Sequence, residues 1–494
     1  MVKELFDQLA AQENQRETLS RIREAIRDEK EYRAARKIAE NGSVLEELLD
    51  SPDAKARKNA AALIGDLEIV QAAPALFCAY KKEETLFVRA TLLKALEKTN
   101  PYPYLQELKD QYELLGAKEV SDDEKKHVRE EMHALGRILR KTGNEKRHIF
   151  TGWNEKFTIL LTTNSRYAYV TANQVHAYRK RITPPGVQAV VDDLEDVLQI
   201  RTFRELLFPI RLEKPVTRKD GPKILGEALV HSQIPDLLKR CHRGTGPFYF
   251  RIDVSAKFPL EERSRYIKRA AAVIEEESAG KLVNAPENYE FELRLLLDKE
   301  EKIHVFLKMH TIPMERFSYR KESISTSIHP STAALLMELA KPYLTERAHV
   351  LDPCCGVGTM LVERHKQLSA GEMYALDIFG EAVEKSRINM TRARMRANVI
   401  QKNYFEFRNA FSFDEIIANM PVAGKRTKTE QDSFYEKFFR KSAELLMPGG
   451  VMILYSNELG FVKKQLRLHP EFQLRKEYLI REKDQFWLFI IVYR

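Results

Sequence analysis

The sequence predicts a chain of three parts: an α-solenoid at the amino end, an α+β region in the middle, and a Rossmann-like, doubly wound α/β sheet at the carboxyl end. Helical segments that each contain an Arg recur in the first part, and β-branched and aromatic runs begin near residue 146. In the last part a glycine-rich turn follows an apolar strand. We place the parts at 1–145, 146–320 and 321–494, and 494 residues suffice for three or four domains of roughly 100 to 200 residues.

Composition excludes several classes of protein. The content of 44% apolar and 31% charged residues is that of an ordinary globular chain, which argues against wholesale disorder. No stretch of about 18 apolar residues predicts a membrane span. The amino end lacks the apolar core of a secretory signal. The four cysteines include the adjacent pair Cys354 and Cys355, which is no disulfide framework, so we expect a cytoplasmic protein without a membrane partner.

The charge is distributed unevenly along the chain. The total is 81 Lys plus Arg against 72 Asp plus Glu, a net of +9. Residues 1–150 contain 27 basic and 28 acidic residues, whereas residues 201–250 contain 10 basic and 5 acidic ones. The excess positive charge therefore lies beyond the helical part and favours a polyanionic partner there.

The first 145 residues show a helical pattern with an internal repeat. Segments 53–65 and 86–96 place Arg57 and Arg89, 32 positions apart, before small and aliphatic residues, and segment 127–136 is a weaker third copy. Such a period indicates stacked helix pairs, although a plain helical bundle is the alternative. The segments resemble HEAT repeats, and this resemblance implies a protein partner for the repeats.

The middle part predicts strands that alternate with helices. The order of the segments from residue 248 onward resembles the THUMP domain, an RNA-binding module of tRNA-modifying enzymes. Taken alone, the order of strands and helices predicts a ferredoxin-like α+β segment and does not indicate a function. The expected strands are 157–162, 167–171, 206–211 and 248–254, with a hairpin of 290–297 and 302–308, and the expected helices are 187–200 and 261–278.

Six basic residues just before the THUMP-like segment are candidates for RNA contact. Their clustering favours a phosphate-binding surface, although each one taken singly fits an ordinary solvated face. They are Arg218, Lys219, Lys223, Lys239, Arg240 and Arg243.

The carboxyl part carries the chemistry. The strand 348–352 leads into the turn Asp352 to Thr359, DPCCGVGT, and then into a helix, so backbone N–H groups at the turn can approach a ligand. The next strand, 373–377, ends in Asp377, 19 residues after Gly358. A carboxylate there can accept protons from both ribose hydroxyls of an adenosine, so the pattern predicts a nucleotide-like cofactor, and NAD would satisfy it too.

The turn lacks GxGxxG spacing and resembles the DPxCGSGT turn of S-adenosylmethionine-dependent methyltransferases that modify nucleic acids. The resemblance implies S-adenosylmethionine as cofactor, with Asp377 on the ribose and Phe379 against the adenine. We expect the adjacent cysteines to pack in the turn and predict no metal site, while His329 is expected to cap its helix or to contact cofactor or RNA. The predicted cofactor-binding residues are Asp352, Pro353, Cys355, Gly356, Gly358, Thr359, Asp377, Phe379, Asn403 and Asn419.

A third motif stands at the end of the strand that begins at Asp414. Asn419-Met420-Pro421 occupies the place where these enzymes have (Asp/Asn)-Pro-Pro-aromatic, their target-amine motif. The Asn419 side-chain carbonyl and the Met420 backbone carbonyl can accept the two protons of an exocyclic amine and aim its lone pair at the methyl group. Met420 replaces the first proline, and Val422 stands where an aromatic ring normally stacks on the base.

Together these features resemble the RNA (guanine-N2) methyltransferases of the THUMP group over residues 150–494. The resemblance implies a class I methyltransferase with a seven-stranded sheet that modifies guanosine N2 in tRNA or rRNA. The alternative is an RNA-binding or scaffold protein whose methyltransferase site has decayed, which the changes at Met420 and Val422 would explain. Methylation of a protein or small molecule is disfavoured by the basic middle segment.

Overall fold

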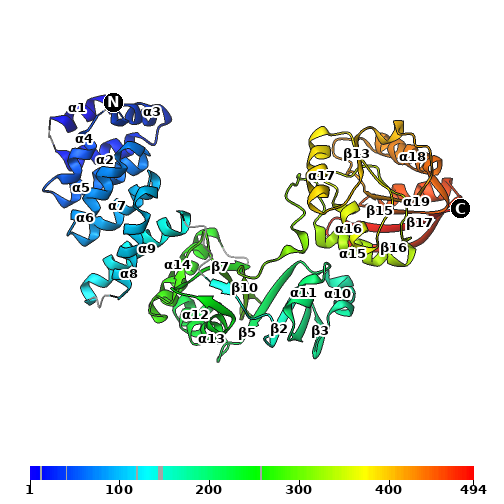
Figure 1. Ribbon diagram of the computed structural model, residues 1–494, viewed down its shortest axis with the longest axis horizontal. Coiled ribbons are helices and arrows are strands. Elements are labelled where there is room, and N and C mark those ends of the chain that lie inside the picture. Colours follow the sequence, from blue (N-terminus) through cyan, green and yellow to red (C-terminus); the bar gives the residue numbers. More distant parts are fainter. Residues whose placement is uncertain (12–13, 41, 118–120, 143–147, 256–258) are drawn as a thin grey trace. The chain divides into compact units, whose positions relative to one another are not determined.

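The computed structural model describes all residues except 12–13, 41, 118–120, 143–147 and 256–258. The chain divides into two compact units, Met1–Lys146 (unit 1) and Arg147–Arg494 (unit 2) (Figure 1). The predicted boundary between residues 145 and 146 lies in the stretch 143–147, outside the described residues.

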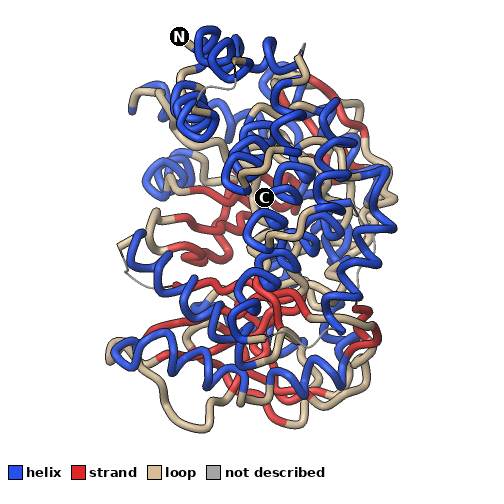
Figure 2. The backbone as a smooth tube through the Cα atoms, turned by 90° about the vertical axis from the view of Figure 1, so that its left-hand side faces the viewer, coloured by secondary structure: helices blue, strands red, loops and turns tan. Residues whose placement is uncertain are grey.

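In its described part, unit 1 is built of helices, and the tube is helical where Figure 2 marks the N-terminus. The long helices pack in succession, α5 on α7 and α7 on α9, with α6 and α8 each against the helix that follows. This two-layer packing agrees with stacked helix pairs, and the HEAT-like assignment stays a prediction. The helices are α1 (Val2–Ala10), α2 (Gln15–Ala25), α3 (Glu29–Glu40), α4 (Val44–Glu47), α5 (Ala54–Asp66), α6 (Ala73–Lys82), α7 (Leu86–Lys98), α8 (Leu105–Ala117) and α9 (Asp122–Thr142).

The two repeated arginines hold successive helices together. Arg57 on α5 bonds the carboxylate of Glu83 at 2.7 Å, and Arg89 on α7 bonds Glu131 on α9 at 2.9 Å. Arg89 also donates to the backbone carbonyl of Glu83 at 2.6 Å, so the two pairs are linked. Both carboxylates are buried, and each therefore depends on its arginine. Arg129 of the weaker third copy is exposed instead.

The amino-terminal portion of unit 2 contains a mixed sheet of eight strands in the order β3-β4-β2-β5-β10-β9-β7-β8. Two further short strands, β1 (His148–Phe150) and β6 (His242–Gly244), pair with each other. The eight strands are β2 (Phe157–Thr162), β3 (Arg179–Thr183), β4 (Gly186–Val191), β5 (Glu205–Ile210), β7 (Phe248–Ser255), β8 (Leu282–Asn284), β9 (Phe291–Leu297) and β10 (Ile303–Met309), and the helices are α10 (Ala168–Gln174), α11 (Leu194–Gln199), α12 (Gly221–Val230), α13 (Ile234–Cys241) and α14 (Leu260–Glu277).

Two predicted elements in this region are wrong. The expected strand 167–171 lies mostly in helix α10, because the Asn164 side chain accepts hydrogen bonds from the N–H groups of Arg166 and Tyr167 and starts a helical turn. The expected helix 187–200 is strand β4 followed by the short helix α11. A Cβ at Gly186 would lie 2.0 Å from the Leu161 carbonyl oxygen, so this glycine permits the close pairing of β4 with β2.

The carboxyl-terminal portion of unit 2 is a seven-stranded sheet in the order β13-β12-β11-β14-β15-β17-β16. Strands β11 to β15 run parallel, and β17 is antiparallel to both of its neighbours. The strands are β11 (Val350–Asp352), β12 (Met373–Asp377), β13 (Asn398–Gln401), β14 (Phe413–Asn419), β15 (Leu446–Ser456), β16 (Phe472–Arg481) and β17 (Phe486–Tyr493), and the helices are α15 (Pro330–Ala340), α16 (Thr359–Gln367), α17 (Gly380–Arg392), α18 (Lys428–Leu445) and α19 (Leu459–Leu468).

Both faces of this sheet are covered by helices (Figure 1). Apolar residues alternate between two cores, so that Val350 faces α15, α16 and α17, while its neighbour Leu351 faces α18 and α19. This confirms the predicted doubly wound sheet. In the part of the chain that the structure describes, no helix is long and apolar enough to span a membrane.

Candidate cofactor and catalytic site

The glycine-rich turn lies at the carboxyl edge of the parallel strands. Asp352 ends β11, and one of its oxygens accepts a hydrogen bond from the Cys354 N–H at 3.1 Å. The Cys355 N–H donates to the Leu376 carbonyl on β12 at 2.8 Å, so the turn is attached to the neighbouring strand. Ligands of such sheets bind at this edge, and the structure brings the predicted turn residues together there.

The two glycines of the turn have different structural roles. Both have left-handed backbone angles, φ +53° at Gly356 and φ +82° at Gly358. A Cβ on Gly358 would lie 2.7 Å from the Met390 Cε atom and 2.8 Å from the Ser386 Oγ atom, so this glycine allows the turn to pack on α17. A Cβ on Gly356 would meet only Ile324, at 3.9 Å, which leaves space beside the turn for a ligand.

Asp377 at the end of β12 orients its carboxylate on the turn. One oxygen accepts a hydrogen bond from the Gly356 N–H at 2.8 Å, and the other accepts one from the Phe379 N–H at 3.0 Å. Each oxygen keeps acceptor capacity for a ribose hydroxyl. The next two side chains, Ile378 and Phe379, are 58% and 67% exposed, and such apolar exposure at a strand end suits an adenine ring.

Asn403 lies just beyond the end of β13 and is exposed. Its side-chain oxygen accepts a hydrogen bond from the Phe405 N–H at 3.1 Å and starts a short 3-10 turn, Tyr404–Glu406. A contact of Asn403 with the cofactor, as the sequence predicts, would therefore use the remaining donor or acceptor capacity of the amide.

Asn419 is the last residue of β14, beside the glycine-rich turn. The Cys354 thiol contacts the Asn419 carbonyl oxygen at 3.6 Å and joins the two strand ends. Within the described residues, the Asn419 side chain and the Met420 carbonyl have no recorded hydrogen bond. The Met420 side chain is buried, and its N–H donates to the Tyr455 carbonyl at 2.9 Å. The backbone at Asn419 and Met420 is thus held in place, and among the described residues the two groups predicted to accept the protons of an amine have no other recorded partner.

Burial controls the ionisation of the turn. Burial, with an added contribution from nearby Asp377, raises the pKa of Asp352 well above the usual range of a carboxyl group. The second oxygen of Asp352 is buried and has no hydrogen-bond partner among the described residues. Burial likewise raises the pKa values of the Cys354 and Cys355 thiols, which keeps both neutral. Neutral, packed thiols agree with the packing role that the sequence predicts.

The loop after Pro421 holds a cluster that the sequence analysis missed. The Arg426 guanidinium lies 4.6 Å from the centre of the Phe434 ring and donates to the Val422 carbonyl at 3.3 Å. The Phe434 ring in turn meets Phe405 edge to face at 5.6 Å. Val422 itself is 45% exposed. The two half-buried rings are candidates for the stacking surface that Val422 cannot supply.

A segment before α15 also lies against the turn, and nothing in the sequence indicated it. The Asn389 side chain on α17 bonds both the N–H and the carbonyl of Glu322 at 3.0 Å. It donates as well to the Val357 carbonyl in the turn at 3.1 Å. This amide therefore holds the segment that brings Ile324 next to Gly356.

His329 caps α15. Its Nδ1 atom accepts a hydrogen bond from the Ser331 N–H at 3.2 Å. Burial, with Arg204, Arg320 and Arg316 nearby, lowers the pKa of His329 to about 4. Of the two roles expected from the sequence, the structure shows the cap.

The six basic residues predicted to contact RNA divide into two groups. Three of them meet carboxylates: Arg218 bonds Glu262 at 2.5 Å and Glu301 at 3.2 Å, Lys223 lies 3.7 Å from Glu227, and Arg240 lies 3.1 Å from Glu155. The others, Lys219, Lys239 and Arg243, are exposed, with no recorded ion pair in the described part of the chain.

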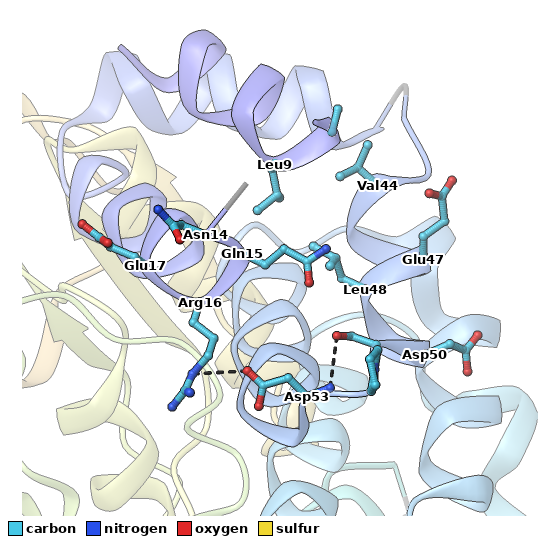
Figure 3. Close-up of a pocket in the computed structure, with 13 residues that line it drawn as sticks. Leu9, Asn14, Gln15, Arg16, Glu17, Val44, Glu47, Leu48, Asp50 and Asp53 are labelled. Atoms are coloured by element: carbon cyan, nitrogen blue, oxygen red, sulfur yellow. Dashed lines mark hydrogen bonds and ion pairs between the residues drawn. The ribbon is translucent and has the colours of Figure 1, made fainter. Parts of the chain in front are cut away.

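Unit 1 contains a cavity of about 980 Å³ (Figure 3). Its wall includes Glu17, Glu47 and Asp50, and the Arg16 side chain turns toward Asp53, 3.2 Å away. Its cation is already paired and its other charges are negative, so this cavity does not suit an anion.

Comparisons with known proteins agree with the site in unit 2. Residues 324–489 match the family model "Methyltransferase small domain". The fold is similar to that of TrmN from Thermus thermophilus, with 19% identity and a TM-score of 0.51 over 69% of this chain and 100% of that one. It is similar too to that of SMU.472 in its complex with SAH, with 14% identity and a TM-score of 0.52 over 68% and 98%. No curated protein matches the chain.

Residues 324–489 thus form a methyltransferase domain of the class I fold, and its cofactor is S-adenosylmethionine. The residues present fit that molecule: there is space beside Gly356, an oriented carboxylate at Asp377 and an exposed ring at Phe379. When bound, the cofactor supplies an electrophilic methyl group on a sulfonium. The residues of this chain have to hold the cofactor and to position the nucleophile of the substrate beside that methyl group.

Proposed function

We propose that the protein is an RNA methyltransferase that acts on an exocyclic amine, with guanosine N2 in tRNA or rRNA as its target. The observation that carries the proposal is the position of Asn419. Its free amide and the free Met420 carbonyl stand at the carboxyl end of β14, joined through Cys354 to the cofactor turn. An amine whose two protons are accepted there has its lone pair directed at the methyl group, so positioning supplies most of the catalysis.

The RNA part of the proposal rests on charge and on the upstream region. The THUMP-like order of elements, one strand, a helix and a hairpin, is present as β7, α14, β9 and β10. Exposed Lys219, Lys239 and Arg243 add positive charge to this part of unit 2.

Nucleoside analysis tests the proposal. The protein is incubated with bulk tRNA or rRNA and with S-adenosylmethionine that carries a labelled methyl group, and the RNA is digested to nucleosides. We expect the label in N2-methylguanosine. Label in another nucleoside would show that guanosine N2 is not the target. Cofactor binding without transfer to any RNA would support the alternative of a decayed methyltransferase site, which the exposed Val422 favours.

A further inference from the structure

A second cavity, of about 490 Å³, lies in unit 2 apart from the cofactor turn and Asn419. Its wall comes from three segments: the end of β2, the beginning of β5 and the first turns of α15. None of the residues predicted to bind cofactor or to act on the amine lines it. The lining residues are Thr162, Thr163, Asn164, Thr202, Arg204, Glu205, Ser331, Thr332 and Leu335.

Arg204 is the cation of this wall. Its N–H donates to the Thr162 carbonyl at 2.6 Å, which fixes the backbone at the cavity. Among the described residues its guanidinium has no recorded hydrogen bond or ion pair. The acid beside it, Glu205, is already neutralised, because Arg294 bonds it at 2.5 Å and Lys308 at 2.8 Å. Against the effect of burial, these two cations lower the pKa of Glu205 to about 2.

Two further arginines lie near Arg204. Arg316 and Arg320 are half-buried, their Nε atoms have no hydrogen-bond partner, and neither forms an ion pair within the described part of the chain. Both act with Arg204 on His329, whose cap holds the start of α15 at the cavity. Arg316 donates to the backbone carbonyls of Phe203 at 3.0 Å and Arg204 at 3.3 Å, so its charge lies close to Arg204 without a carboxylate to neutralise it.

A row of charges leads to the cavity across the eight-stranded sheet. Arg251 on β7 pairs with Glu292 on β9, Glu292 pairs with Arg294, and Arg294 reaches Glu205. With Lys308 on β10, and with Asp253 on β7 at 3.6 Å from Arg294, the row contains three cations and three anions. It connects the THUMP-like strands to Glu205, the residue next to Arg204, and its charges balance. Arg204 is therefore a cation at the cavity that no carboxylate compensates among the described residues.

We propose that the cavity binds one phosphodiester group of the RNA substrate, with the Arg204 guanidinium as its principal donor and the Thr332 hydroxyl as a second. The Thr332 hydroxyl has no recorded hydrogen bond within the described residues. The backbone N–H groups at the start of α15 take no part, since His329 already accepts those of Ser331 and Thr332. The planar guanidinium suits two phosphate oxygens at once. The site rests on the proposed function and specifies where the RNA strand is held.

Filter binding of bulk tRNA over a series of salt concentrations tests the site in the full chain. For Arg204→Ala we expect the slope of log affinity against log salt to become shallower by about 0.7 to 0.9. Arg204→Lys should keep the slope, and Thr332→Val should weaken binding without changing it. Arg467→Ala is the matched control, because Arg467 is exposed, has no recorded partner in the described residues and lies on α19, on the opposite face of the sheet from α15.

Calorimetry with S-adenosylmethionine on each variant separates the outcomes. Unchanged cofactor affinity shows that the variants are folded. Equal slopes for Arg204→Ala and Arg467→Ala, with RNA still bound by the wild type, would overturn the cavity site alone. A wild type that binds no RNA would overturn the RNA substrate and the site together. Titration with inorganic phosphate that depends on Arg204, while the RNA slope does not, would assign the cavity to a free anion and overturn the proposal.

Discussion

The carboxylate of Asp377 orients the glycine-rich turn, and we propose that it also binds the ribose of the cofactor. Its oxygens accept hydrogen bonds from the N–H groups of Gly356 and Phe379 and keep acceptor capacity for ribose hydroxyls. A charge-assisted hydrogen bond contributes about 1.5 to 3 kcal/mol. Asp377→Ala should therefore weaken S-adenosylmethionine binding by about 10- to 150-fold for each bond lost, as measured by calorimetry. Glu384→Gln, on the exposed side of α17, is the control, and equal affinities of the two variants would remove Asp377 from the ribose.

His329 makes the stability of unit 2 sensitive to acid. Its pKa is about 4 in the folded protein and near 6.5 when unfolded, so the unfolded chain binds the proton more tightly. The contribution of His329 to stability is complete above pH 6.5 and is lost as the pH drops toward 4. Burial causes the shift of its pKa, together with the charges of Arg204, Arg320 and Arg316 and against that of Glu205. His329→Asn keeps a capping acceptor without a titrating ring, so urea unfolding at pH 7.5 and pH 5 should show a smaller loss for the variant. Equal losses in both proteins would contradict this role.

At this scale the sequence predicts residues whose position follows from a strand end. Asp377 and Asn419 each close an apolar run, and parallel strands bring their carboxyl ends to one edge. It could not predict Arg204 or Asn389, because the segments around these residues are distant in sequence and no local pattern marks them. Asn403 was selected by motif alone, and its local hydrogen bond to Phe405 could not be anticipated.

Among the elements, the turn between β11 and α16 depends on Gly358 for two separable reasons. Gly358→Ala would meet both a left-handed φ and contacts under 3 Å with α17. Gly449 has φ +84° with no atom within 4 Å of a built Cβ, so Gly449→Ala experiences the backbone cost alone. We expect Gly358→Ala to be the more destabilising by about 1 to 3 kcal/mol in thermal unfolding, because overpacking adds to backbone strain. Equal destabilisation of the two variants would show that the contacts between the turn and α17 relax without a loss of stability.

The success of element prediction follows the clarity of the local pattern. The strand 373–377 appears with the predicted bounds, since it is a short apolar run that ends in an acid. The helix expected at 187–200 was wrong because Gly186 permits a close hairpin, which residue composition does not show. The strand expected at 167–171 was wrong because the Asn164 cap outweighed aromatic and β-branched propensity.

For the whole molecule, the charge distribution favours unit 2 as the location of the RNA affinity that we propose. Unit 1 is nearly neutral, and its repeated arginines are used in buried pairs with Glu83 and Glu131. Deletion of residues 1–146 should leave RNA affinity within a few-fold, with folding checked by circular dichroism. Lys239→Glu in the full chain should weaken binding, because Lys239 is exposed and has no recorded partner in the described residues. Loss of most affinity on deletion, with none on Lys239→Glu, would make unit 1 the RNA reader.

At this scale the sequence predicted that helices precede a mixed region and a doubly wound sheet, because hydrophobic period and glycine placement distinguish these classes. It did not predict that one sheet of eight strands joins the segment before residue 211 to the THUMP-like hairpin, through the pairing of β5 with β10. That pairing joins strands far apart in the chain, and local patterns contain no information about it.

Single-turnover methyl transfer to RNA by the wild type and by Asn419→Ala tests the central claim most directly, with S-adenosylmethionine affinity measured on both proteins. Because we propose that the Asn419 side chain acts on the amine, we expect cofactor affinity to stay within a few-fold and the rate to fall by roughly two orders of magnitude or more. Asn398→Ala, at the exposed start of β13, should leave the rate unchanged. Equal rates for Asn419→Ala and the wild type would contradict the claim that this residue directs the amine.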